Sequence, residues 1–274
     1  MHRHKYNLRE QKLDSTVRDA VYGAAIGDAL GVPYEGEERG TFECTGMVAD
    51  ICRGQEIGTW SDDTSMMLAI CDSIRELGRV DVDDIRKKFQ EWYFDDRYTV
   101  NGVFSVGFTT SISLKIGSGV TSDDCCGNGS LMRTIPLAFA PCGPEDVRKV
   151  SAITHANKLC CDICAEYVKI VWQLLEGIVD KDDLRSTYPV SMLNRDDIRS
   201  GGYVKDTFKA ALWCFLNTDN YADCVLTAVN LGGDTDTTAC VAGGLAGAYY
   251  GIEKIPQEWI DKLQCKDLIN SCLF

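Results

Sequence analysis

The chain has 274 residues, of which 45% are hydrophobic and 25% are charged, and its formal net charge is −13 at pH 7. That composition is typical of a folded globular protein and excludes the disordered and fibrous classes. The acidic excess repels phosphate backbones and anionic lipids, so it argues against general nucleic-acid binding and against membrane binding, whereas it suits divalent cations.

The predicted elements follow a polar N-terminal segment, residues 1–14, which lacks the apolar stretch of a signal peptide. No stretch approaches the length of a membrane-spanning helix. The fourteen cysteines fit reduced core thiols better than a disulfide framework, so we expect a cytoplasmic protein and a monomer. Residues 15–274 contain no Pro/Ser-rich linker and no convincing alternating strand, which predicts one all-α domain.

Apolar or small side chains at helical spacing predict helices over residues 20–31, 67–77, 82–92, 163–178, 208–216 and 239–251. The first and last of these carry rows of glycines four apart: Gly23, Gly27 and Gly31, and Gly243, Gly247 and Gly251. Glycine inside a helix costs up to about 1 kcal/mol relative to alanine, so close helix contact or an approaching ligand must compensate. Both helices are therefore expected near the centre, and Asp28 within the first needs a hydrogen-bonding partner if it is buried.

Two clusters of carboxylates and hydroxyls directly precede predicted helices: Ser61, Asp62, Asp63 and Thr64, and Asp234, Thr235, Asp236 and Thr237. Taken alone, each cluster is explained by N-capping, because helix starts favour acids and hydroxyls. Two clusters in one chain favour a site for a hard cation, since Mg²⁺ and Mn²⁺ prefer oxygen ligands. This interpretation predicts that the two helix starts meet in space.

Three further features are candidates for ligand binding. The segment Gly127, Asn128, Gly129 and Ser130 can form a tight turn whose backbone amides bind an anion, or a plain loop between helices. His155 can donate to a phosphate, or it can be a satisfied core histidine. Glu35, in the loop after the first glycine-rich helix, is a catalytic candidate or a solvated loop acid.

Together, in their order and spacing, these motifs resemble the ADP-ribosylglycohydrolase family over nearly the whole chain, from the Gly23–Gly31 helix to the C-terminal glycine helix. The resemblance implies a compact multi-helix domain with a central cleft that holds two divalent cations, Mg²⁺ or Mn²⁺. The implied metal ligands are Ser61, Asp62, Asp63, Asp234, Asp236 and Thr237, with Asp236 as the bridge.

The implied activity is hydrolysis of the glycosidic bond between ADP-ribose and an acceptor, which reverses mono-ADP-ribosylation. The acceptor is a protein side chain such as arginine or serine, or a small-molecule ADP-ribose ester. By resemblance, the Gly127–Ser130 loop and His155 hold the diphosphate, and Tyr203 packs near the adenosine. Glu35 is the implied general acid/base, and Asp62 and Asp63 are the alternatives.

One motif departs from the family pattern. Arginine-directed bacterial members usually show Phe-Asp-Ile-Gly-Asn, whereas this chain has Ser105 and Phe108 in place of the Asp and the Asn. Ser105 can hydrogen bond to a substrate but cannot act as a carboxylate base. The acceptor therefore stays open, and two alternatives remain: an ADP-ribose-binding pseudoenzyme and a two-metal nucleotide pyrophosphohydrolase.

Overall fold

The computed structural model describes residues 13–274, and the regular elements in that range are all helices. The α-helices are α1 (Val17–Gly31), α2 (Asp62–Leu77), α3 (Val82–Asp95), α4 (Phe108–Ile116), α5 (Pro144–Ser151), α6 (Lys158–Leu175), α7 (Lys181–Thr187), α8 (Val204–Leu216), α9 (Tyr221–Val229), α10 (Thr235–Tyr250), α11 (Gln257–Lys262) and α12 (Lys266–Cys272). Short 3-10 helices connect them: η1 (Val32–Tyr34), η2 (Asp123–Cys125), η3 (Ile135–Ala138), η4 (Pro189–Met192), η5 (Arg195–Asp197) and η6 (Ile252–Lys254). Within the described range, none of the helices combines the length and the apolar character needed to span a membrane.

The helices predicted from apolar periodicity are present as α1, α2, α3, α6, α8 and α10. One boundary is wrong, because α6 ends at Leu175 rather than continuing to Ile178. Gly177 adopts a left-handed φ of 65° there, which ends the helix, and Ile178 is exposed. Most of the predicted polar segment 1–14 lies outside the described residues. All fourteen cysteines fall within residues 13–274 and are free thiols.

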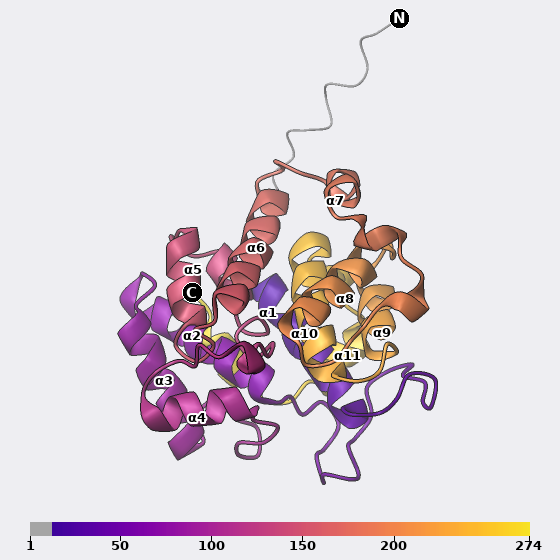
Figure 1. Cartoon of the computed structure of the whole chain (residues 1–274). Coiled ribbons are helices and arrows are strands. Elements are labelled where there is room, and N and C mark those ends of the chain that lie inside the picture. Colours follow the sequence, from indigo (N-terminus) through magenta and orange to yellow (C-terminus); the bar gives the residue numbers. More distant parts are fainter. Residues whose placement is uncertain (1–12) are drawn as a thin grey trace, which may run out of the picture.

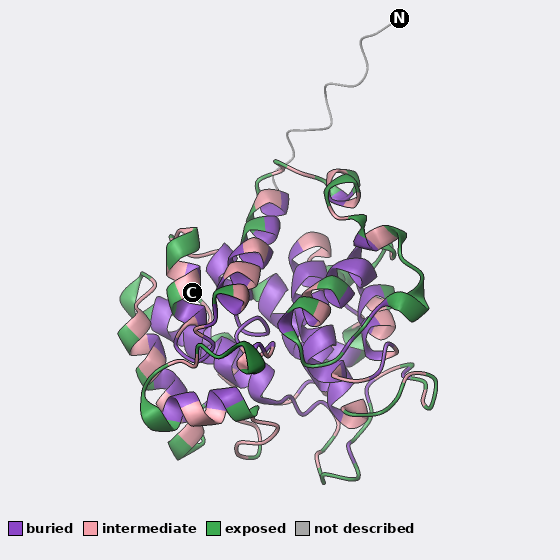
Figure 2. Ribbon diagram, viewed as in Figure 1, coloured by how far each residue is buried: buried purple, intermediate pink, exposed green. Residues whose placement is uncertain are grey.

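Helices α1 and α10 pack against each other in the middle of the molecule (Figure 1), and almost every residue of both is buried (Figure 2). A Cβ atom on Gly27 would lie 2.1 Å from the carbonyl oxygen of Ala239, and one on Gly243 would lie 2.3 Å from that of Gly23. No side chain fits at these separations, so the predicted close contact is confirmed. Gly251 is the exception, because it caps the end of α10 with φ 81°.

The C-terminal half of α1 contacts the starts of both α2 and α10. Asp28 is fully buried and accepts hydrogen bonds from the backbone N–H groups of Ser61 and Thr64, and from the Thr64 hydroxyl at 2.6 Å. Its expected partner is therefore the start of α2. Three residues on, a Cβ atom on Gly31 would lie 2.4 Å from the backbone of Asp236, at the start of α10.

Candidate active site

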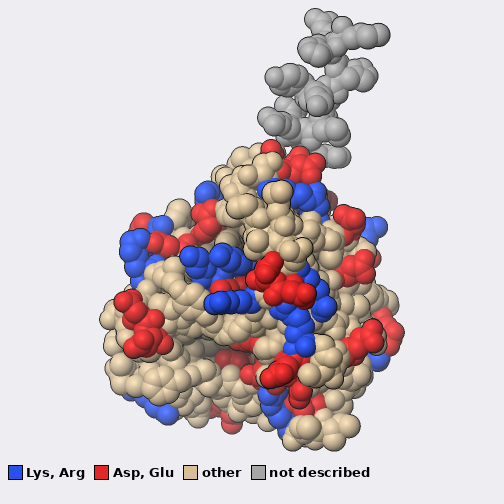
Figure 3. Space-filling model, turned by 45° about the vertical axis from the view of Figure 1, so that its right-hand side comes forward, with Lys and Arg blue, Asp and Glu red and all other residues tan. Residues whose placement is uncertain are grey.

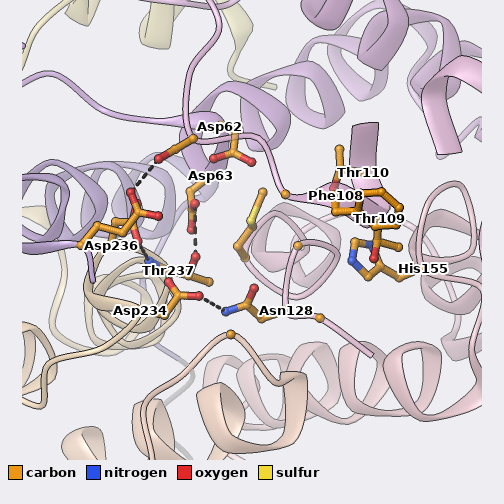
Figure 4. A pocket seen from close by; sticks show the side chains of 17 residues that line it. Asp62, Asp63, Phe108, Thr109, Thr110, Asn128, His155, Asp234, Asp236 and Thr237 are labelled. Atoms are coloured by element: carbon orange, nitrogen blue, oxygen red, sulfur yellow. Dashed lines mark hydrogen bonds between the residues drawn. The ribbon is translucent and has the colours of Figure 1, made fainter. Parts of the chain in front are cut away.

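A cavity of about 250 Å³ opens where α2 and α10 begin. Five carboxylates line it: Glu35, Asp62, Asp63, Asp234 and Asp236. Figure 4 shows the aspartates gathered on one side, with Phe108, Thr110 and His155 on the other. Acidic side chains are also visible inside a hollow of the molecular face in Figure 3.

The two acid-bearing helix starts are in direct contact. The Ser61 side chain caps α2 by accepting the backbone N–H of Asp63, and its hydroxyl donates to Asp63 Oδ2 at 3.2 Å. The Thr237 hydroxyl of α10 donates to the same Oδ2 at 3.4 Å, across 174 residues of sequence. The N-cap interpretation therefore holds at α2 but not at α10, where Asp234 makes no side-chain capping hydrogen bond, and the two helix starts meet in space as predicted.

Burial changes the acidity of these carboxyl groups. It is the largest cause that raises the pKa of Asp62 and Asp63 well above the usual aspartate range, and the nearby Asp28 carboxylate adds to it. Burial, followed by Asp234 and Asp63, raises the pKa of Asp236 in the same way. A cluster of this kind resists ionisation until a positive charge compensates it.

The donor set fits a hard cation. Asp63 Oδ1 is buried and has no hydrogen-bond partner in residues 13–274, so it is an acceptor available to a cation. In the same range, no three His, Cys, Asp or Glu side chains are close enough to hold an ion by themselves. The predicted ligand set is not limited to these residue types, because it also includes the Ser61 and Thr237 hydroxyls.

The predicted anion-binding loop forms another wall of the cavity. Gly127, Asn128, Gly129 and His155 all line it. The Asn128 amide donates to Asp234 Oδ2 and to Thr207 Oγ1, both at 2.9 Å, and so ties the loop to the start of α10. A Cβ atom on Gly129 would lie 2.9 Å from His155 Cε1, so the glycine allows the imidazole to lie against the loop.

Three residues predicted as ligands or contacts do not line the cavity. Ser61 is used as the cap of α2. Ser130 is fully buried, and its hydroxyl accepts a hydrogen bond from Ser151 in the core at 3.0 Å, so its side chain belongs to the core. Tyr203 is 44% exposed at the start of α8, and the neighbouring Gly202 lines the cavity in its place.

Glu35 at the mouth of the cavity has two partners on other loops. Ser105 Oγ donates to Glu35 Oε2 at 2.6 Å, from a backbone with a left-handed φ of 58°. Arg53 forms an ion pair with the same Oε2 at 3.0 Å. Ser105 and Glu35, both predicted as site residues, thus line the cavity and contact each other. No sequence pattern pointed to Arg53.

Sequence reasoning also missed the wall formed by the start of α4, from Gly107 to Thr110. That helix is nine residues long, and its apolar positions alternate with Ser and Thr, so it has no clear helical face. Met132 lines the cavity as well. The only sequence signal near this wall was the altered motif that contains Ser105 and Phe108.

Comparisons with known proteins agree with this arrangement. A sequence model of the ADP-ribosylglycohydrolase family matches residues 9–273. The ADP-ribosylarginine hydrolase Tri1 of Serratia proteamaculans is 34% identical over 282 residues, which cover 93% of this chain and 76% of the relative. The ADP-ribosyl-(dinitrogen reductase) glycohydrolase of Rhodospirillum rubrum is 32% identical over 269 residues, with 90% of each chain covered. A solved structure named as an ADP-ribosylglycohydrolase-related protein complex matches with a TM-score of 0.79 and 28% identity, over 94% of this chain and 95% of that one. The chain is therefore a member of the ADP-ribosylglycohydrolase family, with the all-helical fold of that family.

Proposed function

We propose that this chain uses two divalent cations, Mg²⁺ or Mn²⁺, to hydrolyse the glycosidic bond between ADP-ribose and an acceptor side chain. One observation carries the proposal: the acid-bearing starts of α2 and α10 converge on one cavity, opposite the Gly127–Gly129 loop and His155. Family membership makes the chain a relative of hydrolases that act on ADP-ribosyl groups. The cation requirement, the residue roles and the acceptor are the further content of the proposal.

Oxygen atoms from both helix starts would hold the cations. The proposed ligands are Asp62, Asp63, Asp234, Asp236 and Thr237, which line the cavity, whereas the Ser61 hydroxyl is engaged as the cap of α2. The buried and unpartnered Asp63 Oδ1 supports this assignment. When bound, such cations orient substrate hydroxyls and acidify water.

The carboxylates have a second role in the reaction. Cleavage of a glycosidic bond develops positive charge at the anomeric carbon, which nearby carboxylates stabilise. Glu35 is the proposed proton carrier, a role supported by its carboxylate in the lining of the cavity and by the hydrogen bond from Ser105. Asp62 and Asp63 are the alternative proton carriers, since their raised pKa lets them hold a proton closer to neutral pH.

The diphosphate of ADP-ribose would lie against the Gly127–Gly129 loop and His155. Backbone amides of a tight turn and an imidazole N–H can bind an anion without adding net positive charge. This suits a cavity that already carries several carboxylates and would hold cations. Tyr203, half exposed next to Gly202, is proposed to contact the adenosine.

The proposed acceptor is an arginine side chain, so the substrate would be an ADP-ribosylated arginine. Two relatives are named for ADP-ribosylarginine and for ADP-ribosylated dinitrogen reductase. In this chain Glu35 already binds a guanidinium, that of Arg53, at the mouth of the cavity. Both side chains of that ion pair are partly exposed, so an incoming guanidinium can compete for the Glu35 carboxylate.

The test is release of free ADP-ribose from arginine-, serine- and O-acetyl-linked substrates, with Mg²⁺ or Mn²⁺ and with a chelator. We expect metal-dependent release from the arginine-linked substrate and loss of activity in Asp62→Ala. Asp261→Ala, which removes an exposed acid on α11, is the matched control and should retain activity. Formation of AMP instead of ADP-ribose, or binding of ADP-ribose without turnover on any substrate, would refute the proposal.

A further inference from the structure

Arg133 is a buried cation directly beneath the anion-binding loop. Its side chain is fully buried, lies over the ring of Phe89 at 4.5 Å, and forms no ion pair in the part of the chain that the structure describes. Nη1 donates to the carbonyl oxygen of Gly129 at 3.0 Å, and Nη2 donates to Thr154 Oγ1 at 2.7 Å. A buried guanidinium without a carboxylate is costly, so these two contacts require an explanation.

The hydroxyl of Thr154 connects this guanidinium to His155. Thr154 Oγ1 lies 2.8 Å from His155 Nδ1, and Thr154 is fully buried. A guanidinium can only donate, so Thr154 Oγ1 accepts from Arg133 and keeps one hydrogen of its own. Within residues 13–274, His155 Nδ1 is the one remaining partner that the structure gives this hydroxyl.

Hydrogen counting therefore assigns the tautomer of His155. If Nδ1 carried the proton, the Thr154 hydroxyl hydrogen would be buried without an acceptor, which protein interiors avoid. If Thr154 donates to Nδ1, the Thr154 hydroxyl and His155 Nδ1 are both satisfied, and the neutral ring carries its hydrogen on Nε2. Burial, together with the charge of Arg133, lowers the pKa of His155 to about 3, so the ring is neutral at pH 7.

The protonated edge of the ring faces the cavity. His155 lines it, and a Cβ atom on Gly127 would lie 3.4 Å from His155 Nε2. A hydrogen on Nε2 is a donor toward an anion beside the Gly127–Gly129 loop, whereas a lone pair there would repel that anion.

We propose that Arg133 and Thr154 are positioning residues that fix His155 as the Nε2–H tautomer, so that its ring donates a hydrogen bond to a phosphate oxygen of ADP-ribose. The identity of the anion rests on the proposed function. Arg133 also holds the Gly129 carbonyl oxygen, so one side chain sets both the loop and the imidazole that face the ligand.

The test compares Thr154→Val with Thr134→Val. Both threonines are fully buried, and the Thr134 hydroxyl donates to the carbonyl oxygen of Leu131 at 2.9 Å, so the control removes a similar hydroxyl without contacting His155. Thr154→Ser, which keeps the hydroxyl, is the conservative variant and is expected to behave as the wild type.

The first measurement is the side-chain ¹⁵N chemical shifts of histidine by NMR on the full-length, metal-free protein near neutral pH. The only other histidines of the chain are His2 and His4, so the spectrum is simple. We expect an unprotonated Nδ1 and a protonated Nε2 for His155 in the wild type and in Thr134→Val, and an altered tautomer in Thr154→Val. A wild-type ring protonated on Nδ1 overturns the inference, whether or not Thr154→Val folds.

The second measurement is the affinity for ADP-ribose by calorimetry. Loss of one well-placed donor to a charged group is expected to weaken binding about tenfold in Thr154→Val, and Thr134→Val should change it less than about twofold. Equal loss in both variants, or unchanged affinity despite an altered tautomer, overturns the inference. If the tautomer and the affinity behave as expected but the wild type releases no ADP-ribose from any substrate, the proposed function fails and the inference stands.

Discussion

Replacement of Gly31 by alanine tests whether the contact between α1 and α10 sets the geometry of the site. A Cβ atom at Gly31 would lie 2.4 Å from both Cα and N of Asp236 and 2.5 Å from the carbonyl oxygen of Thr235. All three are backbone atoms, so no side chain can rotate away to make room. The start of α10, which carries Asp236, has to move away from α1.

The expected loss of stability is moderate because two effects oppose each other. Overpacking typically costs about 1–3 kcal/mol, whereas alanine is favoured over glycine within a helix by up to about 1 kcal/mol. We therefore expect the free energy of unfolding to fall by roughly 1–2 kcal/mol, which lowers Tm by about 2–4 °C per kcal/mol in a protein of this size. Gly27→Ala, whose Cβ atom would lie 2.1 Å from the carbonyl oxygen of Ala239, should lose at least as much stability.

Activity separates the two variants. Gly27 lies one turn farther from the cavity, so Gly27→Ala should lose stability with a small change in kcat/KM. Gly31→Ala displaces Asp236 and should lose ADP-ribose release at a given Mn²⁺ concentration by about tenfold or more, the equivalent of about 1.4 kcal/mol. Gly46→Ala is the neutral control, because its Cβ atom would meet only Trp259 Nε1 at an ordinary 3.7 Å. Full stability and activity in Gly31→Ala, or equal activity losses in both helix variants, would show that α1 does not set the position of Asp236.

Three further predictions concern charge and hydrogen bonding. Because the buried carboxyl groups of the site have a raised pKa, the folded chain binds more protons than the unfolded chain, so the stability of the metal-free protein should fall as pH rises above about 4. Mg²⁺ or Mn²⁺ should therefore raise Tm more at about pH 7.5 than at about pH 5. A Tm that is insensitive to both metals would contradict this. Although burial opposes it, hydrogen bonds from Tyr98 and other donors lower the pKa of Asp72 to about 2, so the contribution of Asp72 to stability should persist above about pH 4 and be lost toward pH 2. Asp72→Asn breaks the buried pair with Lys88 and should lower the free energy of unfolding, measured by urea denaturation, by about 3 kcal/mol. Replacement of a surface acid should lower it by less than about 0.5 kcal/mol. Ser105→Ala removes the 2.6 Å hydrogen bond to Glu35 and should lower kcat about tenfold with little change in ADP-ribose affinity, whereas an unchanged kcat would exclude Ser105 as a positioning residue.

The parts of the fold that could be predicted are those with a repeating pattern. Apolar periodicity located the long helices, and the glycine rows predicted the contact that Gly27 and Gly243 make at the centre. Short helices such as α4 carry too few apolar positions to define a face, so the wall of the cavity formed by Thr109 and Thr110 had no signal.

The site could be predicted only where residues are adjacent in sequence. The acids at each helix start were visible as clusters, and their convergence was predicted from the hypothesis that both clusters bind a hard cation. Pairings between distant loops were not visible: Ser105 and Glu35 were each singled out, but they are separated by 70 residues and no local pattern connects them. The direction of a side chain was equally hidden, which is why Ser130 was placed in the ligand site although its hydroxyl bonds to Ser151 in the core.

A single turn of α1 governs the spacing between the two acid clusters. Asp28 and Gly31 are three residues apart, so they lie on neighbouring positions of one helix face. Asp28 holds the start of α2 through its carboxylate, and Gly31 admits the backbone of α10 by having no side chain. The repulsion between Asp62, Asp63 and Asp236 acts against this arrangement, and helix packing opposes that repulsion before any ligand is present. The backbone positions of the site are thus formed before a cation binds. The free energy of cation binding is therefore not reduced by the cost of ordering the chain, and the cation serves to neutralise charge.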